Sequence, residues 1–417
     1  MKLNVLVLGS GGREHVLCEK IRLSPYLGKL FCAPGSDAIA CLAVCADINC
    51  LSPKAVAAFA VENKINLVVV GPEGPLAAGV ADELIKRKIA CFGPTRRGAR
   101  LESSKVFAKN FMKKYAIPTA HFKAFKNFSD VSRYLNQISE RPLVVKASGL
   151  AGGKGVFVCE SKEDALISAR KLMKERIFKD AGERVVIEEC LAGPELSVMA
   201  LTDGRDFVLL PLSRDHKRLK DGDRGPNTGG MGAFAPVSVS IKATNEIETI
   251  FRETLTGIRR EKMDYRGLLY CGLMLTPEGV KVLEFNCRFG DPETQTALPL
   301  IQSDFLALLW ATSQKKLKGL KIKVLKKSSV CVNLVSEGYP EKIKIGRKIL
   351  GLGGENRGVQ IFHCGTALKN GEWKTAGGRV LSVVAVGTRL TKARNSAYQS
   401  AAKIFFQGKA LRRDIAK

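Results

Sequence analysis

The residues best placed to do chemistry lie in a predicted β-hairpin around the turn Thr276-Pro-Glu-Gly279. Because side chains alternate along a strand, one face of its second strand is expected to carry Val280, Val282, Glu284 and Asn286. Glu284 and Asn286 would then lie roughly 6.6 Å apart. A carboxylate and an amide oxygen, completed by water and substrate phosphates, suit Mg²⁺ better than zinc. The alternative is an acid and an amide that simply face water at a strand end.

Two glycine-rich loops could hold phosphate groups. Gly9-Ser-Gly-Gly-Arg13-Glu14 follows a predicted buried strand and opens a helix, where free N–H groups and Arg13 favour a small anion. Glu14 replaces the third glycine of the dinucleotide fingerprint, which disfavours NAD. The loop from Lys146 to Gly155 fails the Walker A pattern, yet Lys154 and its N–H groups could meet a triphosphate. The alternatives are an ordinary glycine turn and a mobile hairpin.

The elements that must position these residues change character along the chain. Strands at 3–8, 67–70 and 89–92 alternate with helices, which predicts an open parallel sheet with ligands at its carboxyl edge. A helix starting at Ser103 is expected to run to Pro118, and we place the first domain boundary there. Strands on both sides of the second glycine loop then predict an α+β lobe.

Three further motifs carry a specific resemblance: Asp215-His-Lys-Arg218, Gly225-Pro-Asn-Thr-Gly-Gly-Met-Gly232 and Glu284-Phe-Asn-Cys-Arg-Phe-Gly-Asp-Pro-Glu-Thr-Gln295. With Gly71-Pro-Glu, Leu101-Glu-Ser-Ser-Lys105 and Gly377-Gly-Arg-Val-Leu-Ser382, the chain resembles the phosphoribosylamine-glycine ligases (glycinamide ribonucleotide synthetases) of the ATP-grasp superfamily. The likeness covers nearly the whole chain. It implies an ATP-grasp fold, α/β and α+β, with an N-terminal open parallel α/β domain (1–118), a small lobe (119–192), a large lobe with the metal and acceptor site (193–327) and a small C-terminal α/β domain (328–417).

The resemblance implies ATP-dependent ligation of glycine to 5-phosphoribosylamine through glycyl phosphate, in purine biosynthesis, with Mg²⁺ or Mn²⁺ held by Glu284 and Asn286. The nucleotide would be bound by Lys105, Lys146, Gly152, Gly153, Lys154, Glu188, Glu189, Leu191 and Glu195. The substrates would be bound by Gly11, Gly12, Arg13, Glu14, Asp215, Lys217, Asn227, Thr228 and Arg288. The expected catalytic residues are Lys154, Arg288 and Asp291.

The chain departs from the family pattern at three places. Ser148 stands where the glycine loop usually has an aspartate, and Pro194 precedes Glu195 where paired acids are common. Residues 267–275 contain no acid, so the second metal carboxylate of many ATP-grasp enzymes has no candidate there.

Composition limits the partners. Lys and Arg exceed Asp and Glu by 67 − 40 = 27, which favours anionic partners without choosing among them. No apolar run is long enough for a membrane span, and twelve cysteines without a CxxC pair fit a reducing, cytoplasmic compartment. The alternatives are another ATP-grasp carboxylate-amine ligase and, less favoured, a degenerate scaffold binding nucleic acid through the lysine-rich residues 315–327. Oligomeric state, and contact with an upstream amidotransferase, stay open.

Overall fold

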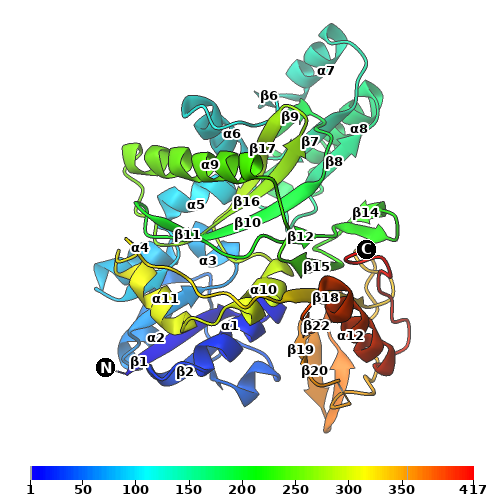
Figure 1. Ribbon diagram of the computed structural model, residues 1–417. Helices are drawn as coiled ribbons and strands as arrows, with labels where there is room; N and C mark the ends of the chain where they lie inside the picture. The colour runs from blue at the N-terminus through cyan, green and yellow to red at the C-terminus, as the bar shows by residue number, and fades with distance from the viewer. Residues whose placement is uncertain (1, 355) are drawn as a thin grey trace.

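The N-terminal part of the chain forms an open, entirely parallel sheet, as predicted. The computed structural model describes residues 2–354 and 356–417, and the strand order of this sheet is β3-β2-β1-β4-β5, drawn in blue in Figure 1. Alternate residues of β1 enter different cores: Val5 and Val7 pack with α1, whereas Leu6 and Leu8 pack with α2 and α4. The elements are β1 (Leu3–Gly9), α1 (Gly12–Arg22), β2 (Leu27–Pro34), β3 (Val44–Cys45), α2 (Pro53–Glu62), β4 (Leu67–Val70), α3 (Glu73–Ala78), α4 (Val80–Lys86), β5 (Ala90–Phe92) and α5 (Arg96–Ser103).

A second sheet, of order β6-β9-β7-β8, forms the small lobe at the top of Figure 1. The glycine loop connects the antiparallel strands β7 and β8. Residues of α7 and α8 bury apolar side chains against this sheet in a core of its own. The elements are α6 (Lys105–Lys114), β6 (Phe122–Phe125), α7 (Phe128–Gln137), β7 (Leu143–Ala147), β8 (Val156–Cys159), α8 (Lys162–Met173) and β9 (Val185–Glu189).

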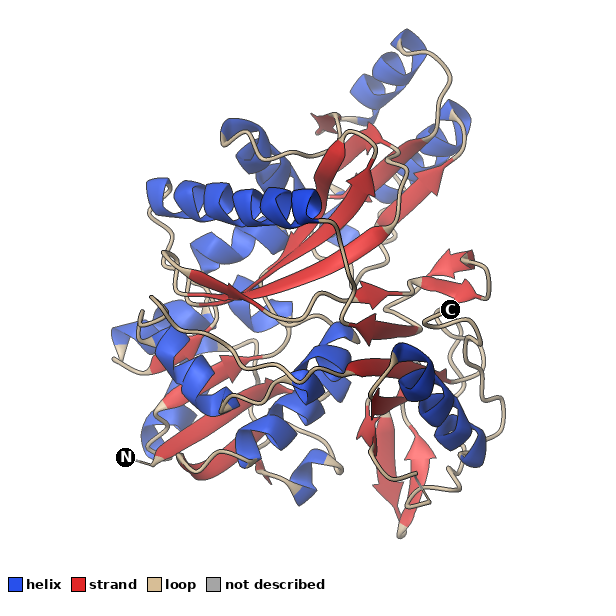
Figure 2. Cartoon of the chain, viewed as in Figure 1, coloured by secondary structure: helices blue, strands red, loops and turns tan. Residues whose placement is uncertain are grey.

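A third sheet, of order β11-β10-β16-β17, forms the floor of the large lobe. Its long helix α9 buries Ile247, Ile250, Phe251, Leu255 and Ile258 at helical spacing and lies across the sheet in Figure 2. Among the described residues, no helix is both long and apolar enough to cross a membrane. The elements are β10 (Glu195–Thr202), β11 (Phe207–Leu209), α9 (Ile241–Arg260), β16 (Gly267–Thr276), β17 (Gly279–Asn286), α10 (Glu293–Ala297) and α11 (Phe305–Ser313).

The fourth sheet joins the end of the chain to its middle. Its order is β12-β15-β18-β22-β19, so two strands from the predicted large lobe complete the C-terminal sheet. This antiparallel sheet therefore ties residues 214–235 to the last ninety residues. The elements are β12 (Arg214–Asp215), β13 (Arg218–Lys220), β14 (Arg224–Asn227), β15 (Gly232–Ala235), β18 (Ser328–Val335), β19 (Val359–His363), β20 (Thr366–Lys369), β21 (Glu372–Thr375), β22 (Arg379–Gly387) and α12 (Leu390–Lys403), with short 3₁₀ turns at Ile39–Cys41, Lys179–Gly182 and Leu298–Leu300.

A β-bulge corrects the predicted face of β17. Gly272 pairs with Glu284, but the next residue, Leu273, pairs with Val282, so Leu283 is an extra residue in the ladder. Val280 and Val282 therefore point into the core with Phe285 and Cys287, while Glu284 and Asn286 share the opposite face. The prediction that all four residues share one face is wrong, because the extra residue reverses the alternation. Glu284 and Asn286 still lie on the same face of β17.

The predicted helix from Ser103 to Pro118 is also wrong in its bounds. Ser104 has an extended backbone, and its Oγ accepts the N–H of Phe107 at 3.3 Å, which ends α5 and starts α6. α6 ends at Lys114, and Ala116 has a left-handed φ of 51°, so the chain turns before it reaches Pro118. The break matters for the site because it fixes where Lys105 begins its helix.

Candidate active site

One cleft of about 780 Å³ lies between the small and large lobes. Its walls come from the glycine loop, the β7–β9 edge, the end of β17 and the loops around residues 215 and 228. The sequence-predicted residues that line it are Lys105, Lys146, Gly152, Gly153, Glu188, Glu189, Leu191, Glu195, Asp215, Lys217, Asn227, Thr228, Glu284, Asn286, Arg288 and Asp291. The glycine loop and the Glu284 strand, predicted from distant parts of the sequence, thus face one cavity.

A buried carboxylate, Glu188 on β9, is shared by two lysines. Lys109 and Lys146 each form an ion pair with it, and all three side chains are almost wholly buried. Lys146 also donates to the carbonyl of Leu283 at 3.2 Å, which ties the small lobe to the floor strand β17. Burial, reinforced by the charge of Lys146, lowers the pKa of Lys109 to about 8.

Sequence reasoning missed Lys109. The available signal was its position one turn after Lys105 on α6, because residues four apart lie on the same helix face. Lys109 also donates to Thr119 Oγ1 at 2.7 Å, and that hydroxyl donates to the carbonyl of Val282 at 2.6 Å. Helix α6, the segment just after the predicted domain boundary at Pro118 and the floor strand β17 therefore meet at this lysine.

Glu284 is a half-buried carboxylate surrounded by cations. Burial would raise its pKa, but the charges of Lys217, Lys105 and Lys146 outweigh burial and lower the pKa below its usual value. Its cross-strand neighbour is Gly272, where an added Cβ would come within 3.3 Å of Glu284 Cγ. No acid faces Glu284 from β16, and the described residues contain no cluster of three or more His, Cys, Asp or Glu that could hold a metal.

Arg288 is held between two carboxylates that the sequence analysis did not assign. Its guanidinium contacts Glu102 at 3.0 Å and Glu73 at 3.5 Å, and it donates to the carbonyl of Phe289 at 3.1 Å. Glu102 also accepts the N–H of Cys287 at 2.7 Å, while burial raises its own pKa. Glu73 and Glu102 belong to the Gly71-Pro-Glu and Leu101-Glu motifs, so those motifs position the arginine.

Asp215 and Lys217 begin the opposite wall. Asp215 Oδ1 is buried and has no hydrogen-bond partner in the described part of the chain, and burial, followed by the nearby charge of Glu293, raises the pKa of Asp215. Lys217 contacts Glu195 at 2.9 Å. Burial would lower the pKa of Lys217, but Glu195 and other acids raise it. Glu195, predicted to bind the nucleotide, therefore pairs with a lysine in this structure.

Thr228 secures the same wall. Its hydroxyl donates to the carbonyl of Lys217 at 2.8 Å and accepts the N–H of Gly230 at 3.0 Å. Deeper in the wall, Glu293 accepts hydrogen bonds from Tyr270 at 2.8 Å and Ser197 at 3.0 Å. The Thr228 bonds fix the backbone of the 217–230 segment, and the Glu293 bonds join α10 to the floor strands β10 and β16.

The first glycine loop lies outside this cleft. Glu14 accepts the N–H of Gly11 at 2.7 Å and contacts Arg13 at 2.6 Å, so the glutamate that replaced a glycine caps its own helix. Arg13 also donates to the carbonyl of Phe289 at 3.1 Å. None of Gly11, Gly12, Arg13 and Glu14 lines the cleft. Through its bond to Phe289, Arg13 supports the segment that follows Arg288.

Lys154 also points away from the cleft. Its ammonium donates to the carbonyl of Pro340 in the C-terminal region at 3.1 Å, although the neighbouring Gly152, Gly153 and Gly155 line the cavity. Gly152 and Gly153 have φ of 56° and 76° and an added Cβ would meet nothing within 4 Å, so this loop tip has room to move.

Comparison with known proteins gives a consistent result along the chain. Models of the phosphoribosylglycinamide synthetase N domain, ATP-grasp (A) domain and C domain match residues 3–102, 103–294 and 329–417. The phosphoribosylamine–glycine ligase of Caldanaerobacter subterraneus subsp. tengcongensis is 44% identical over 416 residues, covering 99% of both chains. A crystal structure of the ligase from Thermotoga maritima has 37% identity and a TM-score of 0.88, covering 99% of this chain and 100% of that one.

Longer proteins also contain a matching region. The trifunctional purine biosynthetic protein adenosine-3 of Gallus gallus is 46% identical over 417 residues, which are 99% of this chain. The chain spans 42% of the length of that protein.

Proposed function

This chain belongs to the phosphoribosylglycinamide synthetase family, and we propose that it ligates glycine to 5-phosphoribosylamine with cleavage of ATP. The observation that carries the proposal is the single cleft shared by the glycine loop, Glu284 and the 215–230 loop. A nucleotide and two acceptor molecules must meet within reach of one another for such a reaction, and this cleft joins both groups of residues.

Lys105, Lys146 and the glycine loop are proposed to hold the ATP phosphates. Glu188, Glu189 and Leu191 at the end of β9 would border the adenine, and Glu195 would exchange its contact with Lys217 for the ribose hydroxyls. The charges of Lys105 and Lys146 also lower the pKa of Glu284. A polyphosphate entering the cleft would therefore find cations already gathered there.

Glu284 and Asn286 fit a divalent cation. Both are oxygen donors on one strand face, and the carboxylate has a lowered pKa, so it is ionised at neutral pH. Because the described residues form no cluster of three or more His, Cys, Asp or Glu that could hold a metal, phosphate oxygens and water would complete the coordination of Mg²⁺ or Mn²⁺. When bound, the ion would withdraw charge from the phosphates.

Asp215, Lys217, Asn227, Thr228, Arg288 and Asp291 are proposed to hold the acceptors. Glycine's carboxylate would attack the γ-phosphorus and release ADP, giving glycyl phosphate. The amine of phosphoribosylamine then attacks the acyl carbon, loses a proton and expels phosphate. No enzyme nucleophile is needed, so the residues act by positioning and by stabilising negative charge, for which the Arg288 guanidinium is well shaped.

The glycine loop is proposed to act as a lid that keeps water from the acyl phosphate. In that role Lys154 leaves Pro340 and turns toward the γ-phosphoryl group, a move that the open space around Gly152 and Gly153 permits. Ser148 supports the base of the lid, because its carbonyl accepts the N–H of Lys105 at 2.8 Å and its hydroxyl accepts the N–H of Val106 at 3.3 Å.

The first glycine loop, Gly11 to Glu14, is proposed to support the phosphoribosylamine side through the segment after Arg288. We also propose that the chain works in the cytoplasm, since its twelve cysteines are all free. A transient contact with the amidotransferase that makes phosphoribosylamine would fit the instability of this amine.

An ADP-release assay tests the function directly. The purified chain is given ATP, Mg²⁺ and glycine, with and without freshly generated phosphoribosylamine, and the product is identified by mass. We expect glycinamide ribonucleotide and stoichiometric ADP only when both acceptors are present. Equal turnover with alanine or serine in place of glycine would indicate another carboxylate-amine ligase, and retention on RNA without ATP turnover would indicate a scaffold.

A further inference from the structure

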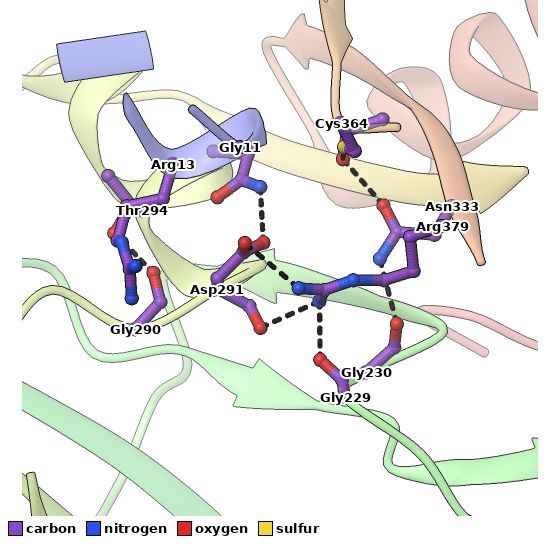
Figure 3. Close-up of polar contacts among 12 residues, drawn as sticks. Gly11, Arg13, Gly229, Gly230, Gly290, Asp291, Thr294, Asn333, Cys364 and Arg379 are labelled. Atoms are coloured by element: carbon purple, nitrogen blue, oxygen red, sulfur yellow. Dashed lines mark hydrogen bonds and ion pairs between the residues drawn. The ribbon is translucent and has the colours of Figure 1, made fainter. Parts of the chain in front are cut away.

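The motif Gly377-Gly-Arg-Val-Leu-Ser382 has no role in the mechanism above, yet its arginine contacts the acceptor wall. Arg379 begins β22 in the C-terminal domain. Its guanidinium donates to the carbonyl of Gly229, donates to the carbonyl of Asp291 at 2.8 Å and contacts Asp291 Oδ2 at 2.9 Å. Figure 3 shows this guanidinium between the two loops.

Both loops held by Arg379 belong to the proposed acceptor site. Gly229 directly follows Asn227 and Thr228, and Asp291 lies three residues after Arg288; all of these line the cleft. Arg379 itself is not among the lining residues. The Arg379 and Asp291 side chains are only 19% and 16% exposed, so their charge-assisted bonds are largely shielded from water. Arg379 would therefore act on the acceptors through the residues that it holds and through its charge near Asp215.

Other side chains of the C-terminal domain hold the backbone of Gly229 and of the next residue, Gly230. Tyr339 Oη accepts the N–H of Gly229 at 3.0 Å, and Asn333 Nδ2 donates to the carbonyl of Gly230 at 2.8 Å. Asn333 is oriented by Ser382, the last residue of the motif, whose hydroxyl donates to Asn333 Oδ1 at 2.6 Å. The backbone of residues 229 and 230 thus takes its shape from the C-terminal domain.

The two loops also pack directly against each other. Gly230 has a φ of 104°, and an added Cβ would lie 2.5 Å from Pro292 Cδ and 2.8 Å from Asp215 Oδ1. A displacement of the 291–292 loop would therefore shift both Gly230 and the unpartnered carboxylate oxygen of Asp215. The nucleotide wall is held differently: Lys105 contacts Ser148, Lys146 contacts Leu283, and Glu188 pairs with Lys109 and Lys146. Its contact with the C-terminal domain runs through Lys154 at the loop tip, which bonds the carbonyl of Pro340 and not the residues that Arg379 holds.

We propose that Arg379 is a positioning residue that sets the geometry of the acceptor half of the cleft and leaves the nucleotide half unaffected. This inference rests on the proposed function, since it assigns the 227–230 and 288–291 loops to the acceptors. An arginine suits this position because its planar guanidinium directs several N–H donors at once toward three oxygen atoms, Gly229 O, Asp291 O and Asp291 Oδ2. A lysine ammonium is a compact point charge and lacks these fixed directions.

The test compares Arg379→Met and Arg379→Lys with the unaltered chain. We expect Arg379→Met to raise the KM for glycine or phosphoribosylamine by at least about tenfold and to lower kcat, and Arg379→Lys to show a smaller change of about threefold. The dissociation constant of ATP, measured without acceptors, should stay within about twofold. Calorimetric titration of glycine into the ADP-bound chain should show the same weakening as the KM.

Lys409→Met is the matched control. Lys409 is a half-buried cation of the same domain that donates to the carbonyls of Ala401 and Ile404, far in the chain from both loops. Loss of this cation should lower thermal stability without altering acceptor KM. Tyr339→Phe provides a second variant with an intact fold, and it should shift acceptor KM in the same direction as Arg379→Met, by less.

The outcomes separate the two proposals. Unchanged acceptor KM and glycine affinity in Arg379→Met and Tyr339→Phe would overturn the inference and leave the proposed function standing. An equal loss of ATP affinity in these variants would overturn it as well, since the effect would then be general. An unaltered chain that binds ATP but makes no glycinamide ribonucleotide would overturn both.

Discussion

The two halves of the cleft are built in different ways. The nucleotide half comes from residues 105–195, where one helix and one antiparallel sheet bring Lys109, Lys146 and Glu188 together. The acceptor half is assembled from loops that follow three different sheets, and the C-terminal domain holds these loops in place through Arg379 and Tyr339. The charged cluster of the first half is formed by elements close in the chain, whereas the second half depends on contacts between distant domains.

This difference suggests that nucleotide affinity and acceptor geometry depend on different parts of the chain. A nucleotide site within one lobe keeps its charges while the lobe moves, which suits a lid that must open for exchange. An acceptor site shared among domains is formed only when those domains are docked, so its geometry depends on contacts far from the reacting atoms. Substitutions in the two halves should therefore give different kinetic signatures.

The largest effect is expected where the halves meet, at Glu284. Glu284→Gln keeps the shape but removes the charge that Lys217, Lys105 and Lys146 stabilise. We expect ADP formation to fall about a thousandfold, together with loss of Mn²⁺ binding to the ATP-bound chain by electron paramagnetic resonance. Glu278→Gln, at an exposed carboxylate on the same hairpin, is the control. Normal Mn²⁺ binding in Glu284→Gln would refute the metal assignment.

Lys109→Met should affect the nucleotide half alone. It leaves Glu188 with one cation in place of two, so Lys146 is drawn more firmly to the carboxylate and is less free to meet phosphate. We expect the KM for ATP to rise about tenfold and the free energy of unfolding to fall by about 3 kcal/mol. Steady-state kinetics and denaturant titration measure the two effects.

Lys113→Met is the matched control for this prediction, since Lys113 is exposed on the same helix. It should leave both measurements unchanged. If Lys109→Met raised the KM for glycine as much as the KM for ATP, the two halves would not be independent.

The sequence alone predicted strands and glycine loops better than the contacts between distant parts of the chain, for a physical reason. Strand β4 has the predicted bounds, and β7 and β8 lie on both sides of the second glycine loop as predicted, because local apolar patterns and glycines define these strands. The bulge at Leu283 could not be predicted, because it depends on pairing with β16 and not on the alternation within β17. The roles of Glu102 and Arg379 were likewise hidden, since each acts on a partner more than eighty residues away.

Lys154→Ala examines whether the lid joins the two halves. We expect kcat to fall about tenfold with the dissociation constant of ATP nearly unchanged, because the ammonium would act on the transition state and not on bound ATP. Lys171→Ala, at an exposed position of α8, should behave as the unaltered chain. A variant that only raised the KM for ATP would place Lys154 in ground-state binding. A variant without any effect would leave it as a tether to Pro340.

The smallest effect on turnover is expected at the junction of the N-terminal and C-terminal domains, where His15 Nδ1 accepts the N–H of His363 at 3.0 Å. Burial lowers the pKa of His15 from 6.5 to about 4. The unfolded chain therefore binds more protons than the folded chain between these values, and the free energy of unfolding decreases as pH falls through that window. One such histidine accounts for about 2 kcal/mol between pH 8 and pH 5.

His15→Asn tests this effect, because the amide oxygen can accept the same N–H without titrating. The difference in free energy of unfolding between pH 8 and pH 5, measured by denaturant titration, should be smaller by about 2 kcal/mol in this variant. Turnover at pH 8 should be unchanged. An equal pH dependence of the free energy of unfolding in both chains would show that His15 does not contribute to it. A loss of turnover at pH 8 would show that helix α1 also contributes to the acceptor half of the cleft.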